Sequence, residues 1–133
     1  CTALTTLNAN VWKASSVGAS AFANCKSLTK ATLSSAALKS IPANAFSGCA
    51  KLQFLQFSSA KVASIGANAF ANCAKLKTIT LKTAKLKKAK VGKNAFKGIA
   101  AKAKVKVPKA KVSAYKKIFK AKGLPKKAKV VAA

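Results

Sequence analysis

A constant interval between cysteines restricts the fold more than any other feature of the sequence. Each cysteine follows the previous one by 24 residues: Cys1, Cys25, Cys49 and Cys73. Three phenylalanines keep the same interval, and a fourth follows after 26 residues: Phe22, Phe46, Phe70 and Phe96. A fixed period of this length is the signature of a repeat protein. We therefore divide the chain into units 1–24, 25–48, 49–72 and 73–98, followed by a divergent segment, 99–133.

Each unit carries an apolar pattern that fits one short strand. Leu52, Leu55 and Phe57 combine a spacing of three with a spacing of two, which neither a helix nor a long strand would repeat. A 24-residue unit cannot bury its apolar side alone, so neighbouring units must stack around a shared core. We expect a parallel sheet with strands near Leu7, Ala31, Leu55, Ile79 and Val105. The expected inward partners are Ala9, Leu33, Phe57, Leu81 and Val107.

The opposite side of each unit is predicted to be a single helical turn. It would begin at residues of the types that cap helix N-termini: Ser20, Asn44, Asn68 and Asn94. It would end at residues that tolerate a left-handed backbone: Asn24, Gly48, Asn72 and Gly98. The expected fold class is an α/β repeat solenoid with a parallel sheet on one face and single helical turns on the other.

The two ends of the solenoid are predicted to differ in how their apolar edges are covered. Apolar residues from Val112 to Phe119 fall on one helical face, and Gly123 and Pro125 end the pattern. We expect a C-terminal capping helix over the last unit, and a partner-binding or membrane-surface helix is the alternative. At the other end, the Leu4 and Leu7 edge lacks a polar cap, so we expect further repeats before residue 1. A lipid-modified N-terminal cysteine is the alternative interpretation of Cys1.

The four cysteines are predicted to form a structural ladder. Zinc sites bring paired cysteines together with two to four residues between them, so an interval of 24 argues against a metal site. The same interval places each thiol at one corner of successive units, where Ile99 fills the last position. We therefore expect buried free thiols beside a buried row formed by the repeated phenylalanines.

The charge composition excludes most catalytic chemistry. The chain has 27 lysines and no aspartate, glutamate, arginine or histidine, with a net charge of +27. General acid–base catalysis draws chiefly on histidine and carboxylates, and carboxylates also hold Mg²⁺ and Ca²⁺. We expect no enzyme activity, no metal and no cofactor. About 15 carboxylates would be usual for this length, so we hypothesise that many alanines occupy positions that were once acidic.

The strand positions that should point outward form a candidate binding surface, because solenoids commonly bind along such faces. The predicted ligand-binding residues are Thr6, Asn8, Lys30, Thr32, Phe54, Gln56, Thr78 and Thr80, and Lys104 and Lys106 continue the column. Phe54 is an aromatic residue where its neighbours carry lysine or threonine, and aromatics are enriched among interface anchors. The alternative interpretation is an isolated exposed apolar residue.

Two stretches, "IPANAFSGCAKLQFLQF" and "IGANAFANCAKLKTITL", resemble the BspA-like leucine-rich-repeat family of bacterial surface proteins, whose units run I-G-x-x-A-F-x-x-C-x-x-L-x-x-I-x-L. The ending from Val91 also resembles the terminal unit and closing helix of secreted Gram-positive members. The resemblance implies a leucine-rich-repeat fold, an extracellular or cell-surface location and adhesion to surface components. Family members commonly carry an acidic residue after I-G, where this chain has Ala67. Trp12 departs from the pattern and is expected to refill volume left by Ala9 and Ala14.

Lysine is concentrated in the second half of the chain, which supports a rival function. Residues 1–74 contain 6 lysines and residues 75–129 contain 21. Such a surface attracts nucleic acid, cell-wall polymers or acidic glycans through its field and through counterion release. The alternative hypotheses to a protein-binding surface are thus an electrostatic binder of polyanions through residues 75–129, and an architectural spacer.

Overall fold

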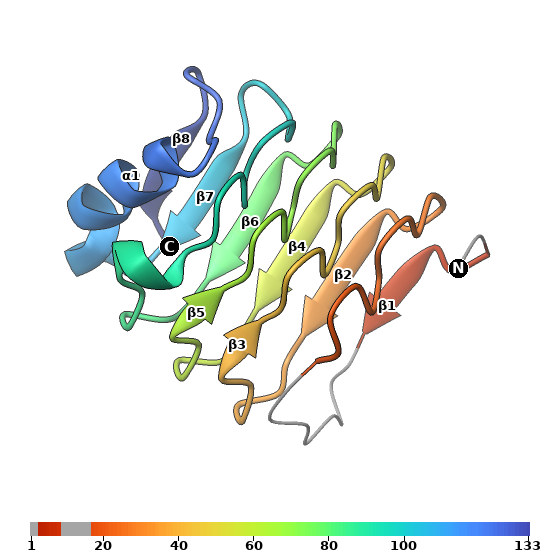
Figure 1. Ribbon diagram of the computed structural model, residues 1–133, viewed down its shortest axis with the longest axis horizontal. Coiled ribbons are helices and arrows are strands. Elements are labelled where there is room, and N and C mark those ends of the chain that lie inside the picture. Colours follow the sequence, from red (N-terminus) through yellow and green to blue (C-terminus); the bar gives the residue numbers. More distant parts are fainter. Residues whose placement is uncertain (1–2, 9–16) are drawn as a thin grey trace.

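The computed structural model describes residues 3–8 and 17–133, and its main feature is a six-stranded parallel sheet (Figure 1). The strands lie side by side in the order β1-β2-β4-β6-β7-β8. Their bounds are β1 Thr6–Asn8, β2 Lys30–Leu33, β4 Phe54–Phe57, β6 Thr78–Leu81, β7 Lys104–Val107 and β8 Lys129–Ala132. Consecutive units therefore stack along one axis, as expected for a repeat solenoid.

The register of the sheet follows the repeat. One row of paired residues runs through Leu7, Ala31, Leu55, Ile79 and Val105, so the predicted pairing is confirmed. Side chains alternate between the two faces of a strand, which leaves every second residue in the core. The predicted inward partners Leu33, Phe57, Leu81 and Val107 are buried. Ala9, Trp12 and Ala14 lie outside the described residues.

A second, smaller sheet was not predicted from the sequence. Strands β3 (Ser40–Ile41) and β5 (Ser64–Ile65) pair in parallel, and a bridge from Ile65 to Val91 extends the same row into the next unit. The glycine after Ile65 is required by this stacking: a Cβ on Gly66 would lie 2.2 Å from the backbone nitrogen of Ala43. The I-G pair therefore marks a close approach between the backbones of adjacent units.

The remaining side of each unit consists of successive turns, so the predicted helical turns are wrong for the described residues. In the second unit, the N–H groups of Phe46 and Gly48 donate to carbonyls of the following unit at 2.8 and 2.9 Å. The N–H groups of Ser47 and Cys49 instead donate to the carbonyls three residues earlier in the chain, those of Asn44 and Phe46. Of these four backbone N–H groups, two thus donate to the neighbouring unit, along the solenoid axis. In an α-helix all of them would donate to carbonyls four residues back in the same helix.

The left-handed residues explain why these turns form. The predicted turn ends Asn24, Gly48, Asn72 and Gly98 have φ angles of 56, 77, 62 and 79°. The predicted N-caps are also left-handed, with φ angles of 57 to 60°: Ser20, Asn44, Asn68 and Asn94. An N-cap requires an extended backbone, so the capping interpretation is wrong. Two left-handed residues in each unit rotate alternate peptide groups toward the neighbouring unit.

A row of buried hydroxyls, which was not predicted from the sequence, follows strands β2, β4 and β6. Ser35, Ser59 and Thr83 are buried and, like the cysteines, are 24 residues apart. The Ser59 hydroxyl donates to the carbonyl of Leu38 at 2.6 Å, and the Thr83 hydroxyl donates to the carbonyl of Val62. These bonds satisfy carbonyl groups of the preceding unit that no sheet hydrogen bond reaches.

The C-terminal segment forms a helix at one end of the sheet (Figure 1). Two 3-10 helices, η1 (Lys88–Lys90) and η2 (Lys109–Lys111), precede helix α1 (Val112–Ala121). Tyr115 and Phe119 are buried, and the rings of Phe119 and Phe96 are 4.5 Å apart. The chain then returns through Gly123, with φ of 95°, into strand β8. This sixth strand was not predicted, and it pairs with β7.

Candidate functional site

The outward positions of the main sheet form two continuous rows. Register pairs join Thr6, Lys30, Phe54, Thr78 and Lys104 in one row. They join Asn8, Thr32, Gln56, Thr80 and Lys106 in the other. We call these ten residues the outer sheet face. The repeat thus brings residues from five units onto one surface, as the outward column of the sequence predicts.

A shallow hollow of about 370 Å³ lies in the middle of the outer sheet face. Six of the eight predicted ligand-binding residues line it: Lys30, Thr32, Phe54, Gln56, Thr78 and Thr80. Thr6 and Asn8 continue the two rows beyond the hollow, and Lys106 contributes from the other side. The hollow is therefore formed by residues of strands β2, β4 and β6 and by Lys106 of β7.

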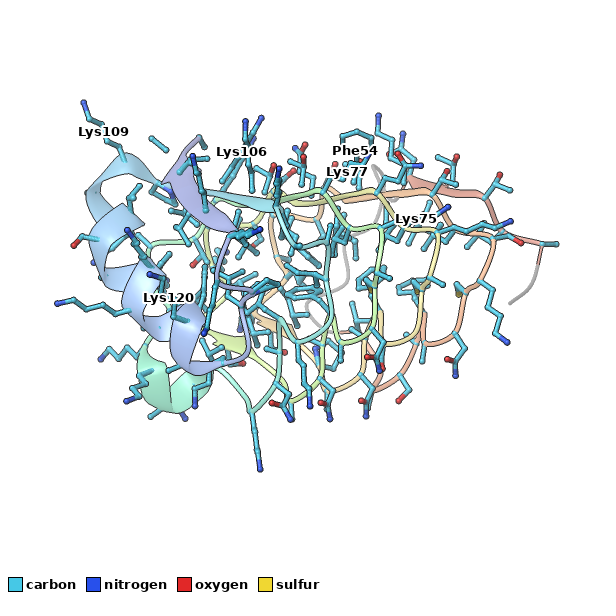
Figure 2. The ribbon with its side chains drawn as sticks, turned by 90° about the horizontal axis from the view of Figure 1, so that it is seen from above. Phe54, Lys75, Lys77, Lys106, Lys109 and Lys120 are labelled. Carbon is cyan, nitrogen blue, oxygen red and sulfur yellow. The ribbon has the colours of Figure 1, made fainter. Side chains whose placement is uncertain are left out.

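Phe54 is the most unusual residue of this surface. It is 47% exposed, and no other large apolar side chain of residues 3–8 and 17–133 is classed as exposed. Its neighbours in register are Lys30 and Thr78. Figure 2 shows Phe54 and Lys106 standing on the same side of the sheet. Nearby, the amide of Gln56 donates to the hydroxyl of Ser58 at 3.3 Å, which orients that side chain at the edge of the hollow.

The predicted cysteine ladder is buried, but its chemistry differs from the expectation at one position. Cys25, Cys49 and Cys73 are all buried. Cys25 is disulfide-bonded, so the prediction of a free thiol is wrong there, whereas Cys49 and Cys73 are free. Cys1 lies outside the described residues.

The two free thiols are held inside the core and interact with each other. The Cys49 thiol donates to the carbonyl of Phe22 at 3.0 Å, and the Cys73 thiol donates to that of Phe46 at 3.0 Å. The interaction with Cys73 lowers the pKa of Cys49, whereas the interaction with Cys49 and burial raise the pKa of Cys73. Burial keeps both sulfurs away from reagents in solution, which suits packing better than nucleophilic chemistry.

The repeated phenylalanines lie in one stacked row beneath the turns. Phe46, Phe70 and Phe96 are buried, and Phe22 at the N-terminal end is half-buried. The rings of Phe22 and Phe46 are 5.3 Å apart, as are those of Phe70 and Phe96. Phe57 inserts from strand β4 between Phe46 and Phe70, at 6.1 and 6.0 Å. These rings belong to the core and leave no space for a ligand.

A larger groove of about 770 Å³ lies at the C-terminal end of the solenoid, where the end of α1 and the turn after it approach strand β8. Seven of its ten lining residues are lysines. The basic region 75–129 was predicted from the sequence, but this groove was not, because strand β8 was not predicted. The alternation of Ala128 and Val130 with Lys127 and Lys129 is the short signal that could have revealed the strand.

Two further observations concern the described part of the chain. Within residues 3–8 and 17–133, no three potential metal ligands of the Cys, His or carboxylate type come together. None of the helices found there has the length and apolar character needed to cross a lipid bilayer.

Comparison with protein families gives one result that agrees with this geometry. The model of the BspA-type leucine-rich-repeat region matches residues 1–125, in six copies. No curated protein and no solved structure matches the chain. The division into units 1–24, 25–48, 49–72 and 73–98 with a segment 99–133 stays a prediction.

Proposed function

We propose, from the premise that this chain belongs to the BspA-type leucine-rich-repeat family, that it is a non-catalytic module that binds a protein through the outer sheet face. Proteins of this repeat family serve as interaction modules, and members are typically bacterial surface or secreted proteins. We infer an adhesion role at the cell surface or outside the cell. The partner would be a protein or another surface component.

We choose the outer sheet face as the binding surface on one observation. The exposed aromatic ring of Phe54 lies in a hollow between polar and basic side chains. Interface hot spots are enriched in aromatic residues that fill a pocket and are surrounded by polar contacts. Thr32, Thr78 and Thr80 offer hydroxyls that both donate and accept, and Gln56 adds an amide. Lys30 and Lys106 border this set, so the proposed partner presents an apolar group near an acidic rim.

The regular backbone beneath the hollow supports the same proposal. All nine residues that line the hollow lie on strands β2, β4, β6 and β7, which are held by parallel pairing. A surface on rigid strands is already ordered before binding, which lowers the entropic cost of association. The spacer hypothesis has no specific observation in its favour, because a spacer needs no exposed aromatic residue.

The experiment measures retention of the fluorescently labelled chain on bacterial and host cell surfaces at two salt concentrations. The double variant Phe54→Ala/Gln56→Ala should bind at least tenfold more weakly, since loss of one aromatic anchor costs about 2 kcal/mol or more. The matched control is Lys61→Ala/Ala63→Ser, at exposed positions outside the hollow. Equal retention of both variants would overturn the choice of face, and absence of any binding by the native chain would favour the spacer.

A further inference from the structure

The groove at the C-terminal end gathers cationic side chains from separate parts of the chain. Helix α1 contributes Lys116 and Lys120, and the turn after it contributes Lys126 and Lys127. The sheet side contributes Lys102, Lys104 and Lys129, with only alanine and valine between the lysines. Figure 2 shows Lys120 on the helix at this end of the molecule, well separated from Lys109.

Repulsion between these lysines destabilises the folded chain, and a bound anion would relieve it. Lys116 and Lys120 are four residues apart on one helix, and like charges at that spacing repel. Lys104 and Lys129 are register partners on adjacent strands, where like charges are also unfavourable. The sequence holds no carboxylate side chain that could pair with any of them. The compensating charge must therefore come from outside the chain.

The lining also restricts the chemistry of the anion. Lysine side chains only donate hydrogen bonds, and the alanine and valine side chains neither donate nor accept. A ligand with hydroxyl or amine donors would find no side-chain acceptor in the groove. Nucleic acid is disfavoured further, because the lining contains no aromatic side chain on which a base could stack and no arginine. The best ligand accepts hydrogen bonds along its whole length.

The basic surface extends beyond the groove toward the middle of the sheet. A neighbouring hollow of about 370 Å³ shares Lys102 and Lys104 with it and adds Lys77. Lysines arranged along such an elongated surface can contact a chain of charges over its length, whereas a single ion would contact only a few of them. We propose that this groove is a binding site for a flexible, unbranched chain of phosphate groups. None of the residues that line the groove also lines the hollow around Phe54, although Lys104 belongs to the outer sheet face.

The test titrates short inorganic polyphosphate into the full chain and compares two charge-matched double variants. Lys116→Gln/Lys120→Gln removes two groove lysines, whereas Lys109→Gln/Lys117→Gln removes two exposed lysines that do not line it. Both lower the net charge by the same amount. We expect the groove variant to weaken binding about tenfold and the control about twofold or less, since counterion release scales with the phosphates contacted. Urea denaturation of both variants shows that each is folded.

The outcomes separate the possibilities. Equal losses in the two variants, or no binding of polyphosphate, would overturn the proposed site. Heparin fragments and single-stranded DNA of similar charge are titrated in parallel, and tighter, groove-dependent binding of either would overturn the proposed ligand class. A glycerol-phosphate oligomer distinguishes a polyol-phosphate polymer from free polyphosphate as the source. Phe54→Ala should leave polyphosphate binding unchanged, which keeps this test independent of the protein-binding proposal.

Discussion

The hydroxyl of Tyr115 donates to the carbonyl of Thr83 at 2.9 Å and accepts a hydrogen bond from the N–H of Leu86 at 3.1 Å. This pair of bonds links helix α1 to the fourth unit, where the interval between the repeated phenylalanines lengthens from 24 to 26 residues. Thr83 is also the last member of the buried hydroxyl row. Tyr115 therefore satisfies a carbonyl and an N–H group of the fourth unit from the C-terminal helix.

Replacing Tyr115 by phenylalanine should lower the free energy of unfolding by about 1–3 kcal/mol. The ring would stay, but a buried carbonyl and a buried N–H would lose their partner. Urea denaturation followed by circular dichroism measures the change. Ser113→Ala, on the exposed side of the same helix, is the control and should change the free energy by less than about 0.5 kcal/mol.

The contribution of Tyr115 should also depend on pH. Burial raises the pKa of its phenol above the ordinary value of 10.0, and the hydrogen bond from Leu86 opposes this only in part. In alkaline solution the unfolded chain ionises first, so the stabilisation is complete below pH 10 and is lost as the pH rises further. The difference in stability between the native chain and Tyr115→Phe should shrink above pH 10, and a constant difference would contradict burial of the phenol.

Phenylalanine to alanine substitutions should lower the stability of the chain by amounts that depend on how deeply each ring is buried. Phe70 lies between Phe57 and Phe96 and is fully buried, so Phe70→Ala should cost about 3–5 kcal/mol. Phe22→Ala should cost less, because that ring is half-buried. Phe54→Ala removes a ring that is 47% exposed and should cost much less stability than Phe70→Ala. Thermal unfolding of the three variants would contradict the stacked row if Phe70 and Phe54 gave similar losses.

Two glycine substitutions test the close approach between units. Gly66→Ala would place a Cβ 2.2 Å from the backbone of Ala43, so adjacent units must separate, at a cost of about 1–3 kcal/mol or more. Gly18→Ala is the matched control, because nothing lies within 4 Å of its Cβ position. Chemical denaturation should show a large loss for the first variant and little change for the second. Similar effects would argue against backbone contact after the I-G pair.

The cysteines should differ in reactivity. Cys49 and Cys73 are buried thiols, so a maleimide should modify them slowly in the native chain and rapidly in urea. Cys25 should react only after a reductant is added, because it is disulfide-bonded. Peptide mapping by mass spectrometry identifies the labelled positions. Fast native modification of Cys73 would show that the ladder is open to solvent.

The sequence predicted the main sheet well because the repeat carries the information. A 24-residue period fixes which residues lie beside one another, so Leu55 and Ile79 could be paired from spacing alone. The turn side was predicted wrongly because asparagine suits both an N-cap and a left-handed residue. Only the hydrogen bonds to the next unit, such as that from Phe46 to Ala69, decide between the two.

The two candidate sites also differ in how much of each could be predicted from the sequence. The hollow around Phe54 lies on in-register strands, so most of its residues could be identified from the sequence. The lysine groove depends on strand β8, which lies outside the units recognised in the sequence, although it begins 25 residues after β7 and pairs with it in register. The hydroxyl row could have been found, since Ser35, Ser59 and Thr83 keep the 24-residue interval. Serine and threonine are mostly exposed in proteins, so the apolar pattern alone did not predict that these residues are buried.

The most direct test of the stacked arrangement is a distance between spin labels at Thr6→Cys and Lys129→Cys. These positions occupy the same row, and five strand spacings of about 4.8 Å separate them, so the labels should lie about 24 Å apart. Native labelling spares the buried Cys49 and Cys73. Double electron–electron resonance should give one narrow distribution near that distance. A broad distribution, or one centred beyond about 40 Å, would contradict the in-register solenoid on which both proposed sites depend.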